Sequence, residues 1–167
     1  MAKYELLAEK SVTVNGVKLF RIRATAAFGS VRAGDEGGFI ESESNLSQSG
    51  EAWVSGKAQV FDEARVSGKA QVFDEARVSG EAGVSDEARV SGKAQVFGEA
   101  QVSLTPVVVL GLDYQVTVSD NALAAGCQCH TFAAWRSKTP QDIAGMDGAK
   151  ATAFYPTLLA ILVALGK

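Results

Sequence analysis

Residues 51–104 read EAWVSG KAQVFD EARVSG KAQVFD EARVSG EAGVSD EARVSG KAQVFG EAQVSL, one six-residue unit repeated nine times without a break. Every unit has Ala at its second position and Val at its fourth. In an extended chain, residues two apart point to the same side, so Ala and Val share one face of a short strand. The remaining positions hold turn-forming and surface residue types. Because so short a strand cannot bury its own Val, the units must coil and stack at about 4.8 Å. The segment therefore predicts a β-solenoid.

The charges at the first position of the units indicate how many units make one turn. If three units close a turn, stacked neighbours lie eighteen residues apart, and two columns of these charges alternate in sign, as cross-strand neighbours prefer. The alternating columns are Glu51, Lys69, Glu87 and Lys57, Glu75, Lys93. A turn of two units would instead stack Lys57 on Lys69. We therefore expect three units, or eighteen residues, per turn.

A third column of first-position residues is entirely acidic. It consists of Glu63, Glu81 and Glu99. One interpretation is a solvated corner, with Arg65 close by. The other is a weak cation site or a docking edge for a basic partner.

This repeat resembles the left-handed β-helix of hexapeptide-repeat proteins, in which triangular turns of eighteen residues carry Val inside and Ala near the corner. The resemblance implies a mainly β fold, a left-handed parallel β-helix. The hand comes from the resemblance, because the general rule for crossover connections favours right-handed ones.

Composition limits the class of protein. The chain has 167 residues, is 47% hydrophobic and carries a net charge of −3, as expected of one domain or a solenoid with small flanking modules. It lacks the basic footprint of a nucleic-acid-binding protein. Residues 1–10 are too charged for a signal peptide, residues 158–165 are too few to span a bilayer, and the two cysteines make no disulfide framework. We expect a cytoplasmic protein that is not embedded in a membrane.

Three regions follow from the pattern. Residues 1–38 form an N-terminal β cap, because strands at 11–14 and 17–23 flank Asn15-Gly16, a strong hairpin signal. Residues 39–110 form the β-solenoid. Its first turn is irregular, with Ile40 and Leu46 in the role of Val, and residues 107–110 are expected to form a short buried strand.

Residues 111–167 form a C-terminal hairpin and helical module. We expect a hairpin around 119–121, a short helix capped by Thr131, and a second helix opened by Thr139 with Pro140. The last helix should start near Asp147 and be kinked at Pro156. Its end, LLAILVAL, is apolar on all sides and must be buried. We expect a dimer or trimer contact there, formed by Leu158, Leu159, Ile161, Leu162 and Leu165.

Aromatic and arginine side chains occupy outward positions on two faces of the predicted coil. Exposed aromatic residues beside Arg are typical of interface hot spots. The candidate partner-binding residues are Trp53, Phe61, Phe73, Arg77, Arg89 and Phe97. The alternative is that flanking segments of the same chain cover the aromatic rings.

The one cluster with reactive side chains is Gly126-Cys127-Gln128-Cys129-His130. Strand alternation would place Cys127 and Cys129 on one face and His130 on the other, and the chain has no further Cys or His. We therefore expect buried small side chains rather than a metal site or a Cys–His nucleophile. Acyltransferases on this coil use a His from the coil or a loop, which residues 51–104 lack. We expect no enzyme activity and no cofactor.

A closer resemblance covers nearly the whole chain. It rests on FRIRA at 20–24, GD at 34–35, GGFIESE at 37–43, the repeats, and GCQCHT at 126–131 with Trp135. This arrangement is similar to hexapeptide-repeat proteins encoded by bacteriophages and prophages. In that family the helix after His-Thr is usually more charged than the FAAW found here. The resemblance implies a phage accessory protein that acts in the cytoplasm of a bacterial host.

Three functional hypotheses remain. The first is a non-catalytic protein-binding solenoid that occupies a host protein, with counter-defence inhibition (an anti-CRISPR-like role) as the expected setting. The second is a structural or oligomerisation component of a phage assembly. The third, which the sequence disfavours, is a hexapeptide-repeat acyltransferase.

Overall fold

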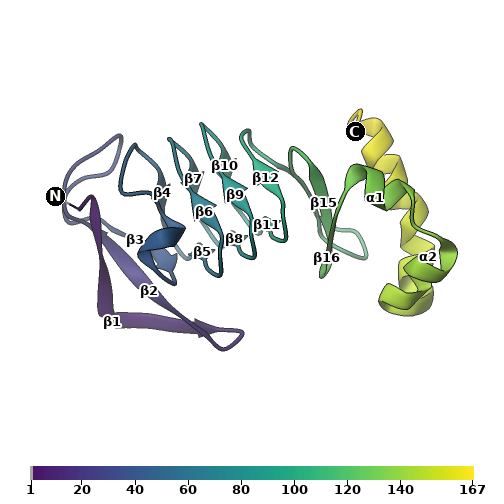
Figure 1. Ribbon diagram of the computed structural model, residues 1–167, viewed down its shortest axis with the longest axis horizontal. Helices are drawn as coiled ribbons and strands as arrows, with labels where there is room; N and C mark the ends of the chain where they lie inside the picture. The colour runs from purple at the N-terminus through teal and green to yellow at the C-terminus, as the bar shows by residue number, and fades with distance from the viewer. Residues whose placement is uncertain (1) are drawn as a thin grey trace.

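The computed structural model describes residues 2–167 and shows a mainly β protein built around a stack of parallel coils. The coils lie in a row between an N-terminal hairpin and a C-terminal module (Figure 1). Each unit supplies one two-residue strand. The strands are β4 Trp53–Val54, β5 Gln59–Val60, β6 Arg65–Val66, β7 Gln71–Val72, β8 Arg77–Val78, β9 Gly83–Val84, β10 Arg89–Val90, β11 Gln95–Val96 and β12 Gln101–Val102.

The strands stack as three walls, named here by their strands: β5–β8–β11, β4–β7–β10 and β6–β9–β12. Paired residues lie eighteen positions apart, as in Gln59 with Arg77 and Arg77 with Gln95. The prediction of three units per turn is therefore confirmed. In the first turn the offset grows to twenty, because Ile40 pairs with Val60 and Leu46 with Val66.

The interior of the coil is made of the Ala and Val of every unit. All of them are at most 3% exposed, and Ile40 and Leu46 take the same place in the first turn with no exposed surface. At the corners, the sixth residue of a unit is Gly or Asp and has a positive φ, as in Gly68 (68°) and Asp74 (61°). Gly adopts this left-handed conformation freely and Asp tolerates it. This explains why the sixth position holds only Gly or Asp in every unit except the last.

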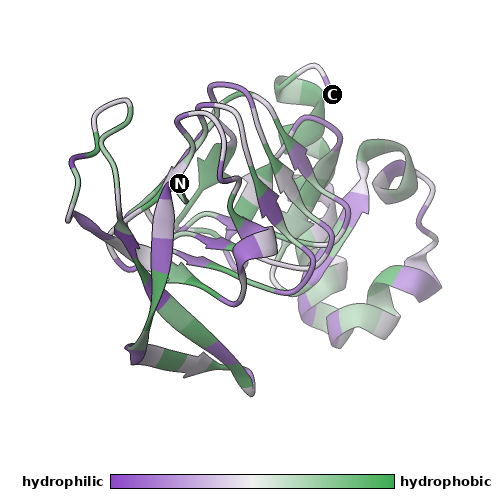
Figure 2. Cartoon of the chain, turned by 60° about the vertical axis from the view of Figure 1, so that its left-hand side comes forward, coloured by the Kyte–Doolittle hydropathy of each residue, from purple (hydrophilic) through white to green (hydrophobic). Residues whose placement is uncertain are grey.

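The N-terminal cap is an antiparallel hairpin of β1 Tyr4–Val14 and β2 Val17–Ala24, joined at Asn15 and Gly16. Both turn residues have a positive φ, 51° and 85°, as a type I′ turn requires. The first strand begins seven residues earlier than the expected 11–14, and its register shifts between Leu7 and Ser11. The hairpin projects from the coil (Figures 1 and 2).

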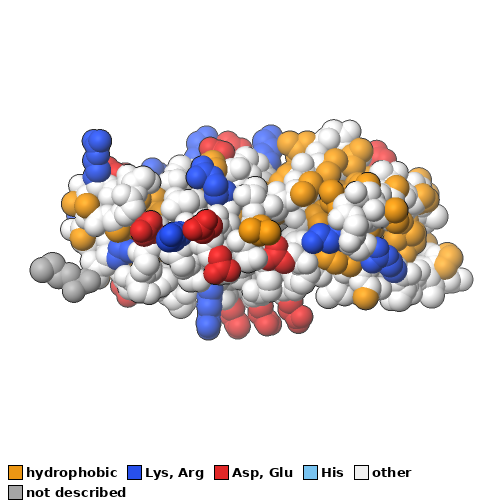
Figure 3. Space-filling view, turned by 90° about the horizontal axis from the view of Figure 1, so that it is seen from above, with side chains coloured by type: hydrophobic (Ala, Val, Ile, Leu, Met, Phe, Trp, Pro, Cys, Tyr) orange, Lys and Arg blue, Asp and Glu red, His pale blue; other side chains and the backbone are white. Residues whose placement is uncertain are grey.

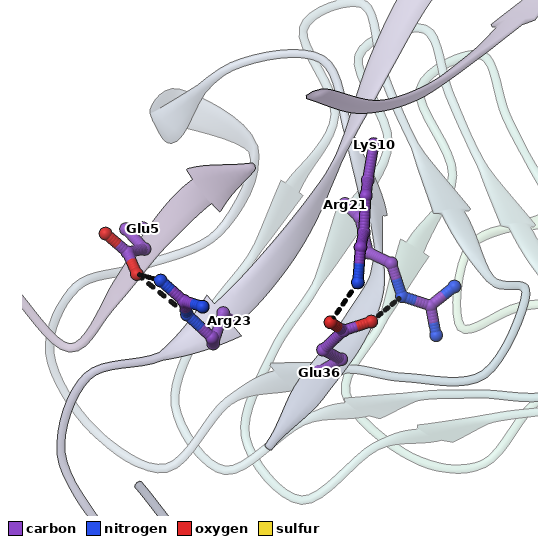
Figure 4. A network of polar contacts seen from close by, with 5 residues as sticks. All are labelled: Glu5, Lys10, Arg21, Arg23 and Glu36. Atoms are coloured by element: carbon purple, nitrogen blue, oxygen red, sulfur yellow. Dashed lines mark hydrogen bonds and ion pairs between the residues drawn. The ribbon is translucent and has the colours of Figure 1, made fainter. Parts of the chain in front are cut away.

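Ion pairs tie the hairpin to β3 Glu36–Ile40, the strand that enters the coil. Glu36 accepts a hydrogen bond from Lys10 and forms an ion pair with Arg21, whose Nε lies 3.1 Å from the carboxylate (Figure 4). Arg23 pairs with Glu5 on the neighbouring strand. Lys10 is the main cause that holds the pKa of Glu36 below its usual range.

Backbone N–H groups of each turn donate to carbonyls of the next turn, so the carbonyls of the first turn have no donor from an earlier turn. Donors from outside the regular repeat cap them. Phe39 N donates to Ala58 O at 2.9 Å. Asn45, at the end of the 3₁₀ turn η1 Glu43–Asn45, donates from Nδ2 to Ala64 O at 2.9 Å. These bonds satisfy backbone groups that burial would otherwise leave unpaired.

The last coil is left with free backbone N–H groups, and side-chain acceptors of the C-terminal module bind them. Gln95 N donates to Thr117 Oγ1 at 3.3 Å, and Gln101 N donates to Asn121 Oδ1 at 2.8 Å. Ser103 N donates to Asp120 Oδ2 at 2.7 Å. The hairpin turn at 119–121 therefore ends the open edge of β12.

The C-terminal module is a four-stranded antiparallel sheet covered by helices. Its strands are β13 Val107–Val109, β14 Val116–Val118, β15 Ala122–Ala125 and β16 Gln128–Thr131, followed by α1 Phe132–Arg136 and α2 Pro140–Ala164. Thr131 and Thr139 cap the two helices as predicted. A second apolar core, which includes Leu123, Trp135 and Phe154, lies between sheet and helices.

Two expectations for this part of the chain are wrong, and one is confirmed. The strand at 107–109 is an edge strand rather than a buried one, with Val107 43% exposed. The strand expected to run through Cys129 instead turns at residues 126–127. The expected start of the last helix near Asp147 is confirmed, because α2 breaks at Asp147 and Gly148, whose φ/ψ are not helical, and Pro156 lies within the helical segment after the break.

Among residues 2–167, no helix has both the length and the apolar character that crossing a membrane requires.

Candidate functional site

The outer surface of the β5–β8–β11 wall combines three columns of stacked side chains. Each column takes one position of the unit, repeated one turn apart. The columns are Lys57, Glu75, Lys93; Gln59, Arg77, Gln95; and Phe61, Ser79, Phe97. Lys57 Nζ lies 3.6 Å from Glu75, so the charges pair along the stack as their alternation predicted.

A groove of about 480 Å³ runs over this wall. Phe61, Arg77 and Phe97 line its floor, Asn15 comes from the tip of the hairpin, and Gln115 and Cys127 from the C-terminal module. The hairpin projects on the side of the coil where β5, β8 and β11 lie (Figure 1). Three parts of the chain that are far apart in sequence thus meet around one concave surface.

The structure separates the six candidate partner-binding residues. Phe61, Arg77 and Phe97 lie together in the groove. Phe73 and Arg89 lie on the β4–β7–β10 wall, where the guanidinium of Arg89 is 5.1 Å from the ring centroid of Phe73.

The expectation of exposed rings is wrong for Trp53 and Phe61, which are 4% and 6% exposed. Trp53 belongs to the core of the coil, where it packs edge-on against Phe28, at 5.4 Å between centroids, and against Tyr4. Phe73 and Phe97 are partly exposed, and Arg77 and Arg89 are exposed. The flanking segments therefore cover Trp53, whereas Arg77 is exposed in the groove.

The three walls differ in charge. The units of the β5–β8–β11 wall hold three bases and two acids, whereas those of the β6–β9–β12 wall hold one base and four acids. The acids of the second set are Glu63, Glu81, Asp86 and Glu99. The groove therefore lies on the least acidic wall of an acidic coil, which favours a partner surface with acidic side chains.

The acidic corner is exposed and shallow. Glu63 and Glu81 line a hollow beside Arg65, where Gly83 leaves out a side chain. Within residues 2–167 no three potential metal-ligating side chains come close enough to hold an ion. The solvated-corner interpretation fits this arrangement.

The Cys–His cluster is split by the turn at 126–127. Cys127 is exposed at the turn, and Cys129 is half-buried against Gly98 of the coil, where burial raises the pKa of its thiol. The ring of His130 packs edge-on against Trp135 at 4.9 Å between centroids, and burial, with a smaller effect of Lys138, lowers its pKa. His130 Nε2 lies 3.2 Å from Gln128 Oε1, so its polar neighbour is an amide rather than a thiol.

The apolar helix end predicted as an oligomer contact is partly covered by its own chain. Leu158 and Leu162 are buried in the C-terminal core, Leu159 and Ile161 are half-buried, and Leu165 is 38% exposed. Hydrophobic side chains also gather on the surface of this end of the molecule, whereas charged ones lie over the coil (Figure 3). Contacts with the sheet of the same chain therefore bury part of the apolar surface of this helix.

Sequence reasoning missed the residues at the ends of the groove. Asn15 was recognised as a turn residue, but its place beside the wall depends on the bend of the hairpin. Gln115 carries no distinctive motif, yet its Nε2 donates to Lys93 O and so holds the C-terminal module against the wall. Only contacts distant in sequence could have revealed either residue.

Comparison with protein-family models and with curated proteins finds no match for this chain. The geometry of the groove therefore carries the functional argument.

Proposed function

We propose that this chain is a non-catalytic protein-binding β-solenoid of phage type that occupies a host protein through the groove on the β5–β8–β11 wall. Counter-defence inhibition in the bacterial cytoplasm, in the manner of an anti-CRISPR protein, is the setting that the phage-like sequence pattern suggests. A left-handed coil belongs to the same proposal, since it rests on the resemblance to hexapeptide-repeat proteins.

The arrangement around Arg77 carries this proposal. An exposed guanidinium lies in a concave surface with two phenylalanine side chains, and three separate parts of the chain build that surface. Arg and aromatic residues grouped at the centre of a concave surface are typical of interface hot spots. The stacked backbone beneath them is rigid, so little conformational entropy is lost on binding.

The same features favour binding over catalysis. The single histidine, His130, packs against Trp135 and does not line the groove. Besides guanidinium, amide and phenyl groups, the groove is lined by the Ser79 hydroxyl and the Cys127 thiol, but its lining holds neither a His nor a carboxylate that could act as a base for them.

Charge reversal at Arg77 tests the proposal. Tagged protein would be used to capture partners from a bacterial host lysate, and captured proteins would be identified by mass spectrometry. We expect Arg77→Glu to lose a protein that the parent chain retains. Arg65→Glu is the matched control, because Arg65 holds the same position in an identical EARVSG unit on the acidic wall. If both variants lost the captured protein, or if both retained it, the assignment of the groove would be contradicted.

A structural role is the second candidate, and the exposed apolar side chains at the C-terminal end favour it. Leu104 and Val163 are each 72% exposed, and Leu110 is 59% exposed. Patches of this kind mark contact surfaces when they are contiguous. Light scattering of the parent chain and of Val163→Glu distinguishes the two roles: a parent oligomer dispersed by the substitution supports assembly, and a monomer at high concentration excludes it.

A further inference from the structure

A second cavity, of about 300 Å³, lies in the C-terminal module between the sheet and α2. Its lining is mostly apolar and aromatic, with a few polar groups at the rim. The aromatic residues are Tyr114, Trp135, Phe154 and Tyr155, and the polar ones at the rim are Gln128 and Asp147. A concave, mostly apolar space with few polar groups is the usual form of a small-molecule site.

The break in α2 creates this space. Asp147 (φ −153°, ψ 40°) and Gly148 (φ 56°, ψ −137°) leave the helical conformation, so the helix changes direction between them. Ile143 and Met146 line the cavity from the segment before the break, and Phe154 lines it from the segment after it. The cavity therefore lies on the inside of an elbow in α2, and residues of the sheet line its other side.

Hydrogen bonds within the chain hold the aromatic walls in place. Trp135 Nε1 donates to Leu123 O at 2.8 Å, and the hydroxyl of Tyr155 donates to Trp135 O. The hydroxyl of Tyr114 donates to the carboxylate of Asp147. The rings of Tyr114 and Phe154 pack edge-on, with 5.1 Å between their centroids. Because these polar atoms are already paired, the walls offer ring surfaces that need little reorganisation to accept a ligand.

The carboxylate of Asp147 is the charged group in the lining of the cavity. The hydrogen bond to Asp147, burial and the charges of Asp147 and Asp113 raise the pKa of Tyr114 to about 12, so this residue stays a neutral donor. Lys150 is the nearby cation, and its Nζ lies 4.5 Å from the ring centroid of Tyr114. The Asp147 carboxylate in the wall, together with the faces of the aromatic rings, favours a cationic ligand group at this end.

The volume limits the size of the ligand. An apolar protein cavity of about 150 Å³ accommodates benzene. The cavity here has about twice that volume, which corresponds to two fused rings. Four aromatic side chains in its wall suit a flat aromatic body in offset or edge-on contact.

We propose that the elbow cavity of the C-terminal module binds a small bicyclic aromatic amine, with its rings between Phe154 and Trp135 and its ammonium group at Asp147. The cavity and the groove have Cys127 in common, but this proposal does not depend on the proposed partner binding.

Tryptamine, an indole ring with an ammonium side chain, is a suitable probe for the full-length chain. The sequence contains two methionines, Met1 and Met146, and Met146 lies in the cavity wall. Methionine methyl NMR therefore reports on the site directly. We expect tryptamine to shift the Met146 methyl resonance with a Kd of about 1 mM or lower. Indole-3-propionate, with a carboxylate in place of the amine, should bind about tenfold more weakly.

Two substitutions on the helix locate the binding. Ala151 lines the cavity, whereas Ala153 is exposed on the same helix. Ala151→Leu fills the space and should abolish the shift, and Ala153→Leu should leave it unchanged. Asp147→Asn keeps an acceptor for Tyr114 but removes the charge, so it should weaken tryptamine by about fivefold.

Three outcomes would overturn the proposal: no tryptamine-dependent shift of Met146 in the parent chain, equal affinities for tryptamine and indole-3-propionate, or an undiminished shift in Ala151→Leu. The last would place the probe outside the cavity.

Discussion

The ammonium group of Lys3 donates a hydrogen bond to the backbone carbonyl of Ala52, with 2.9 Å between nitrogen and oxygen. Ala52 belongs to the first turn of the β4–β7–β10 wall, so no earlier turn supplies a donor for its carbonyl. Lys3 is 7% exposed, and its Nζ also lies 4.8 Å from the ring centroid of Phe28. A charged side chain thus completes the buried edge of the coil.

This bond predicts a specific pH dependence of stability. Burial lowers the pKa of Lys3 from 10.5 to about 8. Between these values the unfolded chain holds a proton that the folded chain has released, so the free energy of unfolding should rise as the pH increases from about 8 towards 10. Urea unfolding of the parent chain and of Lys3→Met, compared pH by pH, isolates the contribution of this group. A difference between the two that is constant with pH would contradict the prediction.

The two ends of the coil should differ in their sensitivity to loss of a capping amide. Asn45 has no exposed surface, and its Nδ2 donates to Asp62 O and Ala64 O. Asn121 caps the other end from an exposed position. Asn45→Ala should lower the free energy of unfolding by about 3 kcal/mol and Asn121→Ala by about 1 kcal/mol, because water can replace only the second cap. Urea denaturation checks the order, and equal losses would contradict it.

The elbow of α2 depends on glycine at one position. Gly148 has φ 56° and ψ −137°, a region that other residues enter only with strain, so Gly148→Ala should lower the free energy of unfolding by about 1–3 kcal/mol. Gly145 lies in the helical segment before the break, and Gly145→Ala should raise it by about 0.5–1 kcal/mol. An added Cβ meets no atom within 4 Å at either position, so thermal unfolding compares the backbone terms alone. The same sign for both variants would contradict this account.

The charge columns should contribute little to stability although they mark the register. Lys57 and Glu75 lie 3.6 Å apart with side chains 79% and 55% exposed, and Lys69 with Glu87 forms a similar pair at 3.4 Å. Glu75→Gln and Glu87→Gln should each change the free energy of unfolding by less than about 0.5 kcal/mol, since solvent screens exposed pairs. A loss above about 1 kcal/mol in chemical denaturation would show that the columns stabilise the coil directly.

Much of the local structure was predictable from local pattern. The inward positions of the coil follow from Ala and Val in every unit. The number of units per turn follows from the alternating charges. The type of turn at Asn15-Gly16 and the helix starts at Thr131 and Thr139 follow from short-range hydrogen bonding that a few neighbouring residues decide.

The candidate site was predictable only in part. Outward positions for Phe61, Arg77 and Phe97 follow from the repeat, but the groove around them requires the bend of the hairpin and the hold of Gln115 on the coil. The burial of Trp53 was likewise not predictable from the repeat, because it depends on contacts with Tyr4 and Phe28.

The sequence alone determined the stacked coil with eighteen residues per turn, because Ala and Val recur in every unit and the alternating charges at the first position indicate three units per turn. Only the tertiary structure decided which outward side chains stay exposed and where the elbow cavity forms. Those features depend on single contacts between distant segments, which no periodicity in the chain encodes.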